Sequence, residues 1–151
     1  RSATPFIENQ DGNKRYGDGY RFEPGKDELI RKGSAGYIVS YGEMLYRCLD
    51  AVESLKQEGI DVGLINKPTL NVVDKDMLSV AGASPFVLVV ESQSTKTGLG
   101  SRYGTWLLEN GFTPKYAHLG TCKEGRGGLG EQVDHQGCDP ASIKKAVAGL
   151  R

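Results

Sequence analysis

A glutamate that directly follows a run of apolar residues is the strongest candidate for chemistry in this sequence. Glu91 ends the run 86–90, and a polar loop leads from it to Gly98-Leu99-Gly100-Ser101. Open α/β sheets bind ligands at the carboxyl ends of their strands, where helix N-termini also present backbone amides. Glu91 could therefore bind a substrate, or it could accept hydrogen bonds from the amides of the next helix. The candidate anion or interdomain contact at this point comprises Glu91, Gly98, Gly100 and Ser101.

A second candidate is the glycine-rich stretch 125–130, which satisfies the pattern G-x-G-x-x-G. A dinucleotide site needs this pattern directly after a strand, with an acidic residue about twenty positions later. The stretch instead follows the nearest expected strand by several residues, and no acidic residue lies at that distance. Lys123 and Arg126 could still surround a phosphate or carboxylate together with backbone amides. A glycine-rich loop without a ligand is the other interpretation.

The remaining reactive side chains do not form catalytic or metal-binding patterns. His118 and His135 have no carboxylate or cysteine at ligand spacing, so no metal site is expected. No Gly-x-Ser-x-Gly turn is present to hold a nucleophilic serine. The three cysteines are odd in number and lack Cys-x-x-Cys spacing, which favours a reducing compartment, the cytoplasm.

Composition excludes two classes of partner. The chain has 151 residues, the length of one domain, with 19 basic and 19 acidic residues interspersed. Because the opposite charges balance, the chain has no positive electrostatic field that would attract nucleic acid or an anionic membrane. No apolar run reaches the length of a membrane span. The first residues, 1–5, contain neither an initiator methionine nor a signal peptide, so the chain is expected to begin within a longer protein.

The elements that would position Glu91 alternate between strand and helix. Apolar residues recur at three- and four-residue steps from Leu45 to Leu55, the spacing of one buried helical face, and Gly59 ends that helix. Strands are expected at 36–41, 60–66, 86–91 and 115–119, and helices at 43–58, 75–81, 98–110 and after Asp139-Pro140. This alternation predicts an α/β protein with buried parallel strands.

Residues 1–25 are polar and glycine-rich and cannot form a core of their own. They are interpreted as a linker, and residues 26–151 as the domain. Tyr16, Tyr20 and Phe22 could attach this linker either to a neighbouring domain or to the helices of its own domain.

The order of these elements resembles the C-terminal domain of transketolase-type thiamine diphosphate enzymes, over roughly residues 22 to 148. Three segments carry the resemblance: 26–76, with its strand ending Tyr-Gly; Val89-Val90-Glu91 with the glycine-rich helix start at 98–101; and His118-Leu119-Gly120 with Gly137-Cys138-Asp139. Cys138 stands where leucine is usual, and segment 71–74 replaces the frequent Lys-Pro-Leu-Asp. These departures weaken the assignment to a subfamily more than the assignment of the fold.

The resemblance implies a three-layer open sheet of about five strands, mostly parallel, with Glu28 to Arg31 as an antiparallel edge strand and helices on both faces. The parent enzyme would transfer a two-carbon ketol unit between phosphosugars, as a homodimer that needs thiamine diphosphate and a divalent metal, Mg or Ca. Its N-terminal and middle domains would hold the cofactor and be the partners of this domain. Gly17-Asp18-Gly19 is similar to the family's metal-binding start, but no Asn-Asn follows, so it is interpreted as a loop.

On this interpretation the domain supports the dimer and the interdomain packing, binds no cofactor, contributes no catalytic residue and is inactive alone. The beta subunits of 2-oxo-acid dehydrogenases carry a similar domain that docks the lipoyl acyltransferase, and residues 25–33 resemble theirs equally well. The same domain occurs in 1-deoxy-xylulose-5-phosphate synthase. A small-ligand sensor that uses the loop 125–130 is a third hypothesis.

Overall fold

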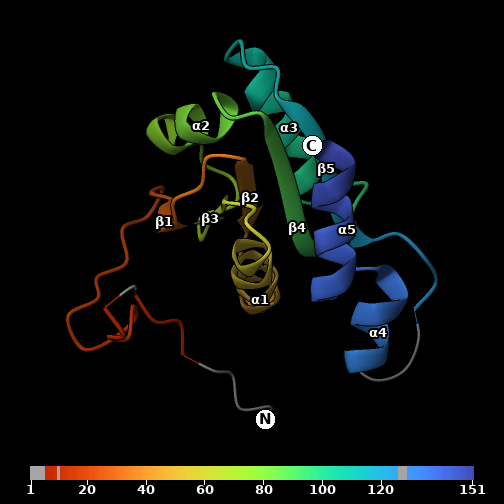
Figure 1. The fold of residues 1–151 in the computed structure, drawn as a ribbon. Helices are drawn as coiled ribbons and strands as arrows, with labels where there is room; N and C mark the ends of the chain where they lie inside the picture. Colours follow the sequence, from red (N-terminus) through yellow and green to blue (C-terminus); the bar gives the residue numbers. More distant parts are fainter. Residues whose placement is uncertain (1–5, 10, 126–128) are drawn as a thin grey trace.

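Five strands form one open sheet in the computed structural model, which describes residues 6–9, 11–125 and 129–151 (Figure 1). The strands are β1 (Glu28–Arg31), β2 (Gly36–Ser40), β3 (Val62–Asn66), β4 (Phe86–Ser94) and β5 (Lys115–Thr121). Their order across the sheet is β1-β3-β2-β4-β5. β1 pairs antiparallel with β3, and all other neighbours pair parallel. The expected α/β sheet with one antiparallel edge strand is confirmed.

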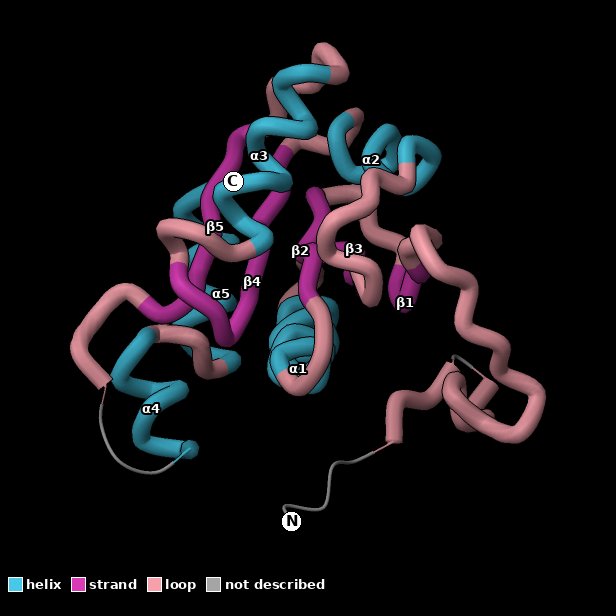
Figure 2. Tube along the Cα trace, turned by 180° about the vertical axis from the view of Figure 1, so that it is seen from behind, coloured by secondary structure: helices cyan, strands magenta, loops and turns pink. Residues whose placement is uncertain are grey.

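Helices cover both faces of the sheet (Figures 1 and 2). They are α1 (Met44–Gln57), α2 (Lys75–Gly82), α3 (Leu99–Glu109), α4 (Leu129–Gln136) and α5 (Pro140–Leu150). Residues of α1, α4 and α5 pack on one face, and residues of α2 and α3 pack on the other. Successive residues of β4 alternate between these two cores: Phe86, Leu88 and Val90 belong to the first, Val87 and Val89 to the second. A strand buried on both faces explains the uninterrupted apolar run.

The helix ends follow the signals in the sequence. Gly59 has φ +79°, and the N–H of Ile60 donates to the carbonyl of Leu55 at 2.9 Å, which closes α1 with a Schellman motif. The side chain of Asp139 accepts the N–H of Ser142 at 3.0 Å and so caps α5.

The patterns above do not predict α4. This helix has only eight residues and follows a glycine-rich stretch. Val133 is its only apolar side chain described as buried, so no helical periodicity is visible there.

The N-terminal segment, residues 6–9 and 11–25, lies beside β1 and is bonded to it (Figures 1 and 2). The hydroxyls of Tyr16 and Tyr20 each donate to the carboxylate of Glu28 at 2.6 Å. Ile7 is buried in the core against the α1 face, whereas Phe22 remains 52% exposed. Tyr16 and Tyr20 therefore attach the segment to a strand of its own domain, and Tyr16 also packs against the core on the α1 face.

The hydrogen bonds around Glu28 lead us to expect an acid-dependent contribution to stability. Burial alone would raise the pKa of Glu28, but hydrogen bonds from Tyr16, Tyr20 and Asn66 together hold this pKa below its ordinary value of 4.5. Such a carboxylate stabilises the fold above pH 4.5, and the contribution is lost as the pH falls through the lowered pKa. The difference in free energy of unfolding between wild type and Glu28→Gln should therefore shrink from about pH 7 to about pH 3. Urea titrations at several pH values measure this difference, and a constant difference would contradict the expectation.

One ion pair is enclosed between the start of the domain and the loop after β3. The Lys67 ammonium donates to both carboxylate oxygens of Asp27, at 3.0 and 3.2 Å, and to the Val72 carbonyl at 2.7 Å. Both charged side chains are 1% exposed. Asp74, which caps α2, also accepts the N–H of Asp27 at 2.9 Å. Burial raises the pKa of Asp27 to about 6 despite the adjacent Lys67, so desolvation offsets much of the attraction within the pair.

Candidate functional site

Glu91 lies near the carboxyl ends of the two central strands, β2 and β4. The chain leaves β2 toward β3 through α1, and it leaves β4 toward β5 through α3, so the two connections diverge (Figure 1). Open α/β sheets form their ligand crevice at such a divergence. Glu91 thus occupies the position at which proteins of this class usually bind a ligand.

The Glu91 carboxylate is fully buried and bonded to its own chain. Its oxygens accept hydrogen bonds from the backbone N–H groups of Leu99 and Gly100, each at 2.8 Å, and from the Tyr41 hydroxyl at 3.0 Å. The first amides of a helix carry partial positive charge, so a carboxylate stands here in place of an external anion. Burial raises the pKa of Tyr41, and Glu91 raises it further, so the hydroxyl stays protonated and donates. This geometry is that of a helix-capping carboxylate.

Two glycines allow this close approach between β4, β5 and α3. A Cβ atom on Gly98 would lie 2.3 Å from Glu91 Oε2, and a Cβ atom on Gly100 would lie 2.3 Å from His118 Nδ1. Real Cβ atoms do not approach other heavy atoms so closely. The spacing Gly98-x-Gly100 is therefore needed to seat the start of α3 on the carboxylate and on β5.

Gly98→Ala is expected to lower the free energy of unfolding by about 1–3 kcal/mol, because the added methyl group must displace the buried Glu91 carboxylate. Chemical denaturation measures the loss. Gly149→Ala in α5 is the matched control, since a Cβ atom there meets nothing within 4 Å. Alanine is the better helix former, so the control should lose no stability. Equal losses in the two variants would contradict the close-approach explanation.

Two hollows open beside this cap. One, of about 270 Å³, includes Tyr41, Ser94, Thr97, Gly98 and Arg102 in its lining. The other, of about 310 Å³, is lined by Glu43, Met44, Glu91, Ser92, Thr121, Gln132, Val133, Gln136 and Cys138. Ligand pockets usually span about 300–1,000 Å³ and carry only a few polar groups. Both hollows are close to the lower limit of this range, and polar residues contribute much of their lining.

The other candidate residues are distributed as follows. Ser101 is exposed, and its hydroxyl donates to the Gly98 carbonyl at 2.9 Å. The Lys123 ammonium donates to the His135 carbonyl at 3.0 Å, so Lys123 contacts α4 rather than the Glu91 cap. Arg126 lies outside the described residues. The structure therefore brings Glu91, Gly98, Gly100 and Ser101 together at the start of α3, with Lys123 in a separate loop.

Two residues that sequence reasoning did not single out organise this edge. Tyr41 follows β2, and its hydroxyl donates to Glu91. The residues just before these two, Ser40 and Val90, pair across the parallel strands β2 and β4. The position of Tyr41 at the end of a strand parallel to that of Glu91 was the available signal. The buried Gln136 side chain accepts the N–H groups of Cys122 and Lys123, at 2.9 and 3.0 Å, and donates to the Lys123 carbonyl at 3.0 Å. Nothing in the sequence near Gln136 indicates this role.

The described part of the chain lacks two further features. Residues 6–9, 11–125 and 129–151 contain no cluster of three or more histidine, cysteine, aspartate or glutamate side chains that could hold a metal ion. None of the helices within those ranges has both the length and the apolar character needed to cross a membrane.

Solved structures share this architecture. The chain superimposes on a split-gene transketolase with a TM-score of 0.85 and 24% identity, covering 99% of this chain and 47% of that one. A transketolase from Campylobacter jejuni gives a TM-score of 0.63 at 13% identity, over 83% of this chain and 18% of that one. At these identities the likeness establishes the fold, an open α/β sheet found within transketolases.

The sequence matches the family model for the transketolase C-terminal domain over residues 25–143. The chain therefore belongs to the transketolase C-terminal domain family, and the expected resemblance is confirmed.

The related proteins are longer than this chain. It is 28% identical over 139 residues to one of the subunits of the apulose-4-phosphate transketolase of Actinobacillus succinogenes, covering 89% of this chain and 45% of that protein. It is 32% identical over 89 residues to 1-deoxy-D-xylulose-5-phosphate synthase 1 of Geobacter metallireducens, covering 58% and 14%. The chain thus spans less than half the length of these relatives.

Proposed function

We propose that this chain is the C-terminal domain of a thiamine diphosphate-dependent enzyme that transfers a two-carbon ketol unit between phosphosugars. The family match over residues 25–143 carries the proposal, and the transketolase names of several relatives support it. Thiamine diphosphate supplies the carbanion chemistry in such enzymes. The N-terminal and middle domains would hold this cofactor with Mg or Ca, and residues 1–25 would be the linker from the middle domain.

The role of this domain would be to support the dimer and the packing between domains. The bonds from Leu99 and Gly100 to Glu91 support that role, because the helix N-terminus at the sheet crevice is already neutralised by an internal carboxylate. A diphosphate does not fit there without displacing Glu91. The two small hollows flank the same edge and offer surfaces for neighbouring domains. The domain alone should then have no ketol-transfer activity.

The proposal also assigns the enzyme to the cytoplasm. Cys48, Cys122 and Cys138 are all free thiols, which suits a reducing compartment.

An antibody against the chain would test the function by isolating the intact parent species from source material. We expect a polypeptide or complex larger than 151 residues that contains thiamine diphosphate and transfers a ketol unit from a ketose phosphate to an aldose phosphate. The 151-residue chain assayed alone is the control and should be inactive. A free chain of this size without cofactor would overturn the proposal. Co-isolation of a lipoyl acyltransferase would instead assign the chain to a 2-oxo-acid dehydrogenase beta subunit.

A further inference from the structure

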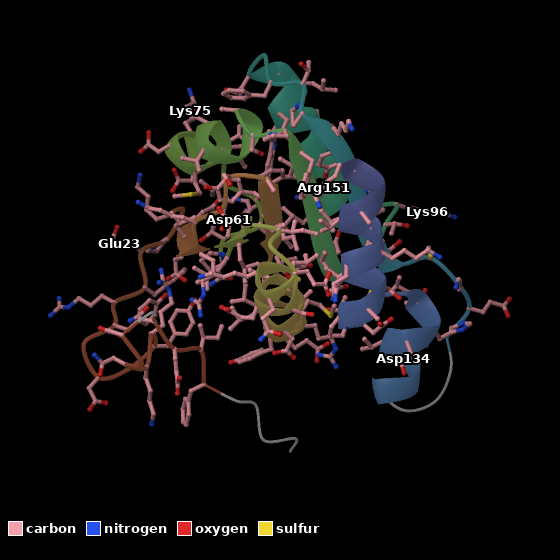
Figure 3. All side chains as sticks on the ribbon, in the orientation of Figure 1. Glu23, Asp61, Lys75, Lys96, Asp134 and Arg151 are labelled. Carbon is pink, nitrogen blue, oxygen red and sulfur yellow. The ribbon has the colours of Figure 1, made fainter. Side chains whose placement is uncertain are left out.

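An asparagine followed by a glycine ends α3. Of the five asparagines in the chain, only Asn110 precedes a glycine, Gly111. Both residues are exposed, and Asn110 is the C-cap of α3. In Figure 3 the labelled Lys96 marks the loop before α3, and the turn 110–112 lies at the other end of this helix, at the top of the picture. The Asn-Gly pair is therefore separate from the Glu91 cap.

The Asn-Gly pair can undergo a reaction that needs only water. The Gly111 nitrogen attacks Cγ of the Asn110 side chain and gives up its proton, the Cγ–Nδ2 bond breaks, and ammonia leaves. The product is a five-membered imide ring, and water then breaks one of its two imide C–N bonds to give aspartate or isoaspartate. Glycine favours the attack because it has no side chain to block the approach. The other asparagines precede residues with long or branched side chains.

The fold holds the two reacting groups apart. The ψ angle of Asn110 is 12°, so the Gly111 nitrogen nearly eclipses the backbone nitrogen of Asn110, whereas ring closure requires it beside Cβ. The N–H of Gly111 donates to the Leu108 carbonyl at 3.0 Å. The side-chain NH₂ of Asn110 donates to the Trp106 carbonyl at 2.8 Å. These bonds must open before the imide can form.

Phe112 holds this turn closed. Its N–H donates to the Leu107 carbonyl at 2.9 Å and, together with the bond from Gly111, completes a Schellman motif. Its ring packs against α2, where a Cβ atom on Gly82 would lie 2.4 Å from the ring. The ring also packs against the core on the α2 and α3 face of the sheet. Because the turn opens only when these contacts are lost, the reaction rate should follow the opening of this turn.

We propose that Asn110 is a site of spontaneous deamidation whose rate is set by the opening of the C-terminal turn of α3. The product weakens the same turn. A carboxylate in place of the amide cannot donate to the Trp106 carbonyl, and it adds negative charge at the C-terminal end of a helix. Isoaspartate also adds a carbon to the main chain and so disrupts the Schellman motif. The modification therefore loosens the end of α3 from α2, and it requires no enzymatic role of the domain.

Peptide mass mapping of the 151-residue chain during incubation at neutral pH tests the site. We expect the peptide that contains Asn110 to gain, with time, the mass difference between oxygen and NH. Asn110→Gln should show no such gain there, since its longer side chain would have to close a larger ring. Asp11-Gly12 and Asp18-Gly19 can form the same imide by losing water, but rehydration restores their mass. The absence of a gain at Asn110, or an equal gain at the other asparagines, would overturn the proposal.

The role of the turn is tested by comparing rates at Asn110. The folded chain should react at least roughly tenfold more slowly than the chain unfolded in guanidinium chloride, because several hydrogen bonds must open first. Phe112→Ala should speed the reaction severalfold, and Phe112→Leu, which keeps an apolar side chain, should speed it less. Leu108→Ala is the matched control, because it removes a side chain that is 68% exposed and keeps the carbonyl.

Circular dichroism and thermal unfolding check that the three variants remain folded. The control should react at the wild-type rate. Equal rates in the folded and unfolded chains would contradict the control of the reaction by the turn. The same conclusion would follow if Leu108→Ala accelerated the reaction as much as Phe112→Ala.

Discussion

Replacing Glu91 with alanine is expected to lower the free energy of unfolding by at least about 2–6 kcal/mol, because each of the two amides left unbonded costs about 1–3 kcal/mol. The backbone N–H groups of Leu99 and Gly100 and the Tyr41 hydroxyl all donate to this fully buried carboxylate. The cavity left by the side chain adds to the loss. Such a loss is a large part of the roughly 5–15 kcal/mol that ordinarily stabilises a domain. Urea denaturation measures it directly.

Two controls make this expectation specific. Glu91→Gln keeps the size and one acceptor oxygen but turns an NH₂ group toward a backbone donor, so it should lose less stability than alanine and still be clearly destabilised. Glu109→Ala, at the exposed end of the same helix, should change the free energy of unfolding by less than about 0.5 kcal/mol. If Glu91→Ala were as mild as Glu109→Ala, the capping role of Glu91 would be wrong.

Lys67→Met is expected to cost about 3–5 kcal/mol, since it leaves the Asp27 carboxylate buried without its partner. The corresponding change at the other partner, Asp27→Leu, should cost a similar amount because the buried Lys67 ammonium then loses its counter-charge and keeps the Val72 carbonyl and the face of the Trp106 ring. Thermal and urea unfolding of both variants measure these losses. Hydrogen exchange of segment 11–25 should also increase, because the pair joins the chain just after that segment to the loop after β3.

The double variant Asp27→Leu/Lys67→Met should recover most of the stability lost by either single variant. Both desolvation costs disappear together, and well-packed apolar side chains often replace a buried ion pair without net loss. Lys26→Ala is the comparison for an exposed cation, because the Lys26 side chain is 56% exposed and its ammonium lies 3.5 Å from the exposed Asp76 and 3.9 Å from Asp74. Its cost should be at most about 1 kcal/mol. Additive losses in the double variant would show that the two side chains do not act as a pair.

Local signals in the sequence were sufficient to predict most of the helices and strands of the fold. The apolar run of β4 predicts a strand because a strand buried on both faces is apolar throughout. The glycines after α1 and α3 predict the ends of these helices because they adopt positive φ angles. The apolar run also placed Glu91 near the end of the strand, although β4 continues three residues beyond it to Ser94. Its hydrogen-bond partners Leu99 and Gly100 are only eight and nine residues away, so a single strand–helix connection determines the geometry.

Contacts between distant segments could not be predicted. Lys67 and Asp27 are 40 residues apart, and nothing local distinguishes a buried lysine from an exposed one. Gln136 bonds across a gap of 13 to 14 residues, and the short helix that carries it lacks apolar periodicity. These interactions depend on which loops the sheet order brings together, and that order is a property of the whole chain.

The N-terminal segment beside β1 has a consequence for aggregation. A sheet edge presents unpaired N–H and C=O groups that can pair with another chain, and short strands, charged side chains and covering segments prevent this. β1 is a four-residue strand at the edge of the sheet, and its Arg31 side chain donates to the Glu8 carbonyl of the segment. Proteolytic removal of the segment would keep all five strands yet expose this edge to intermolecular pairing. We therefore expect a stretch that resembles a simple linker to help keep the protein from forming extended sheets.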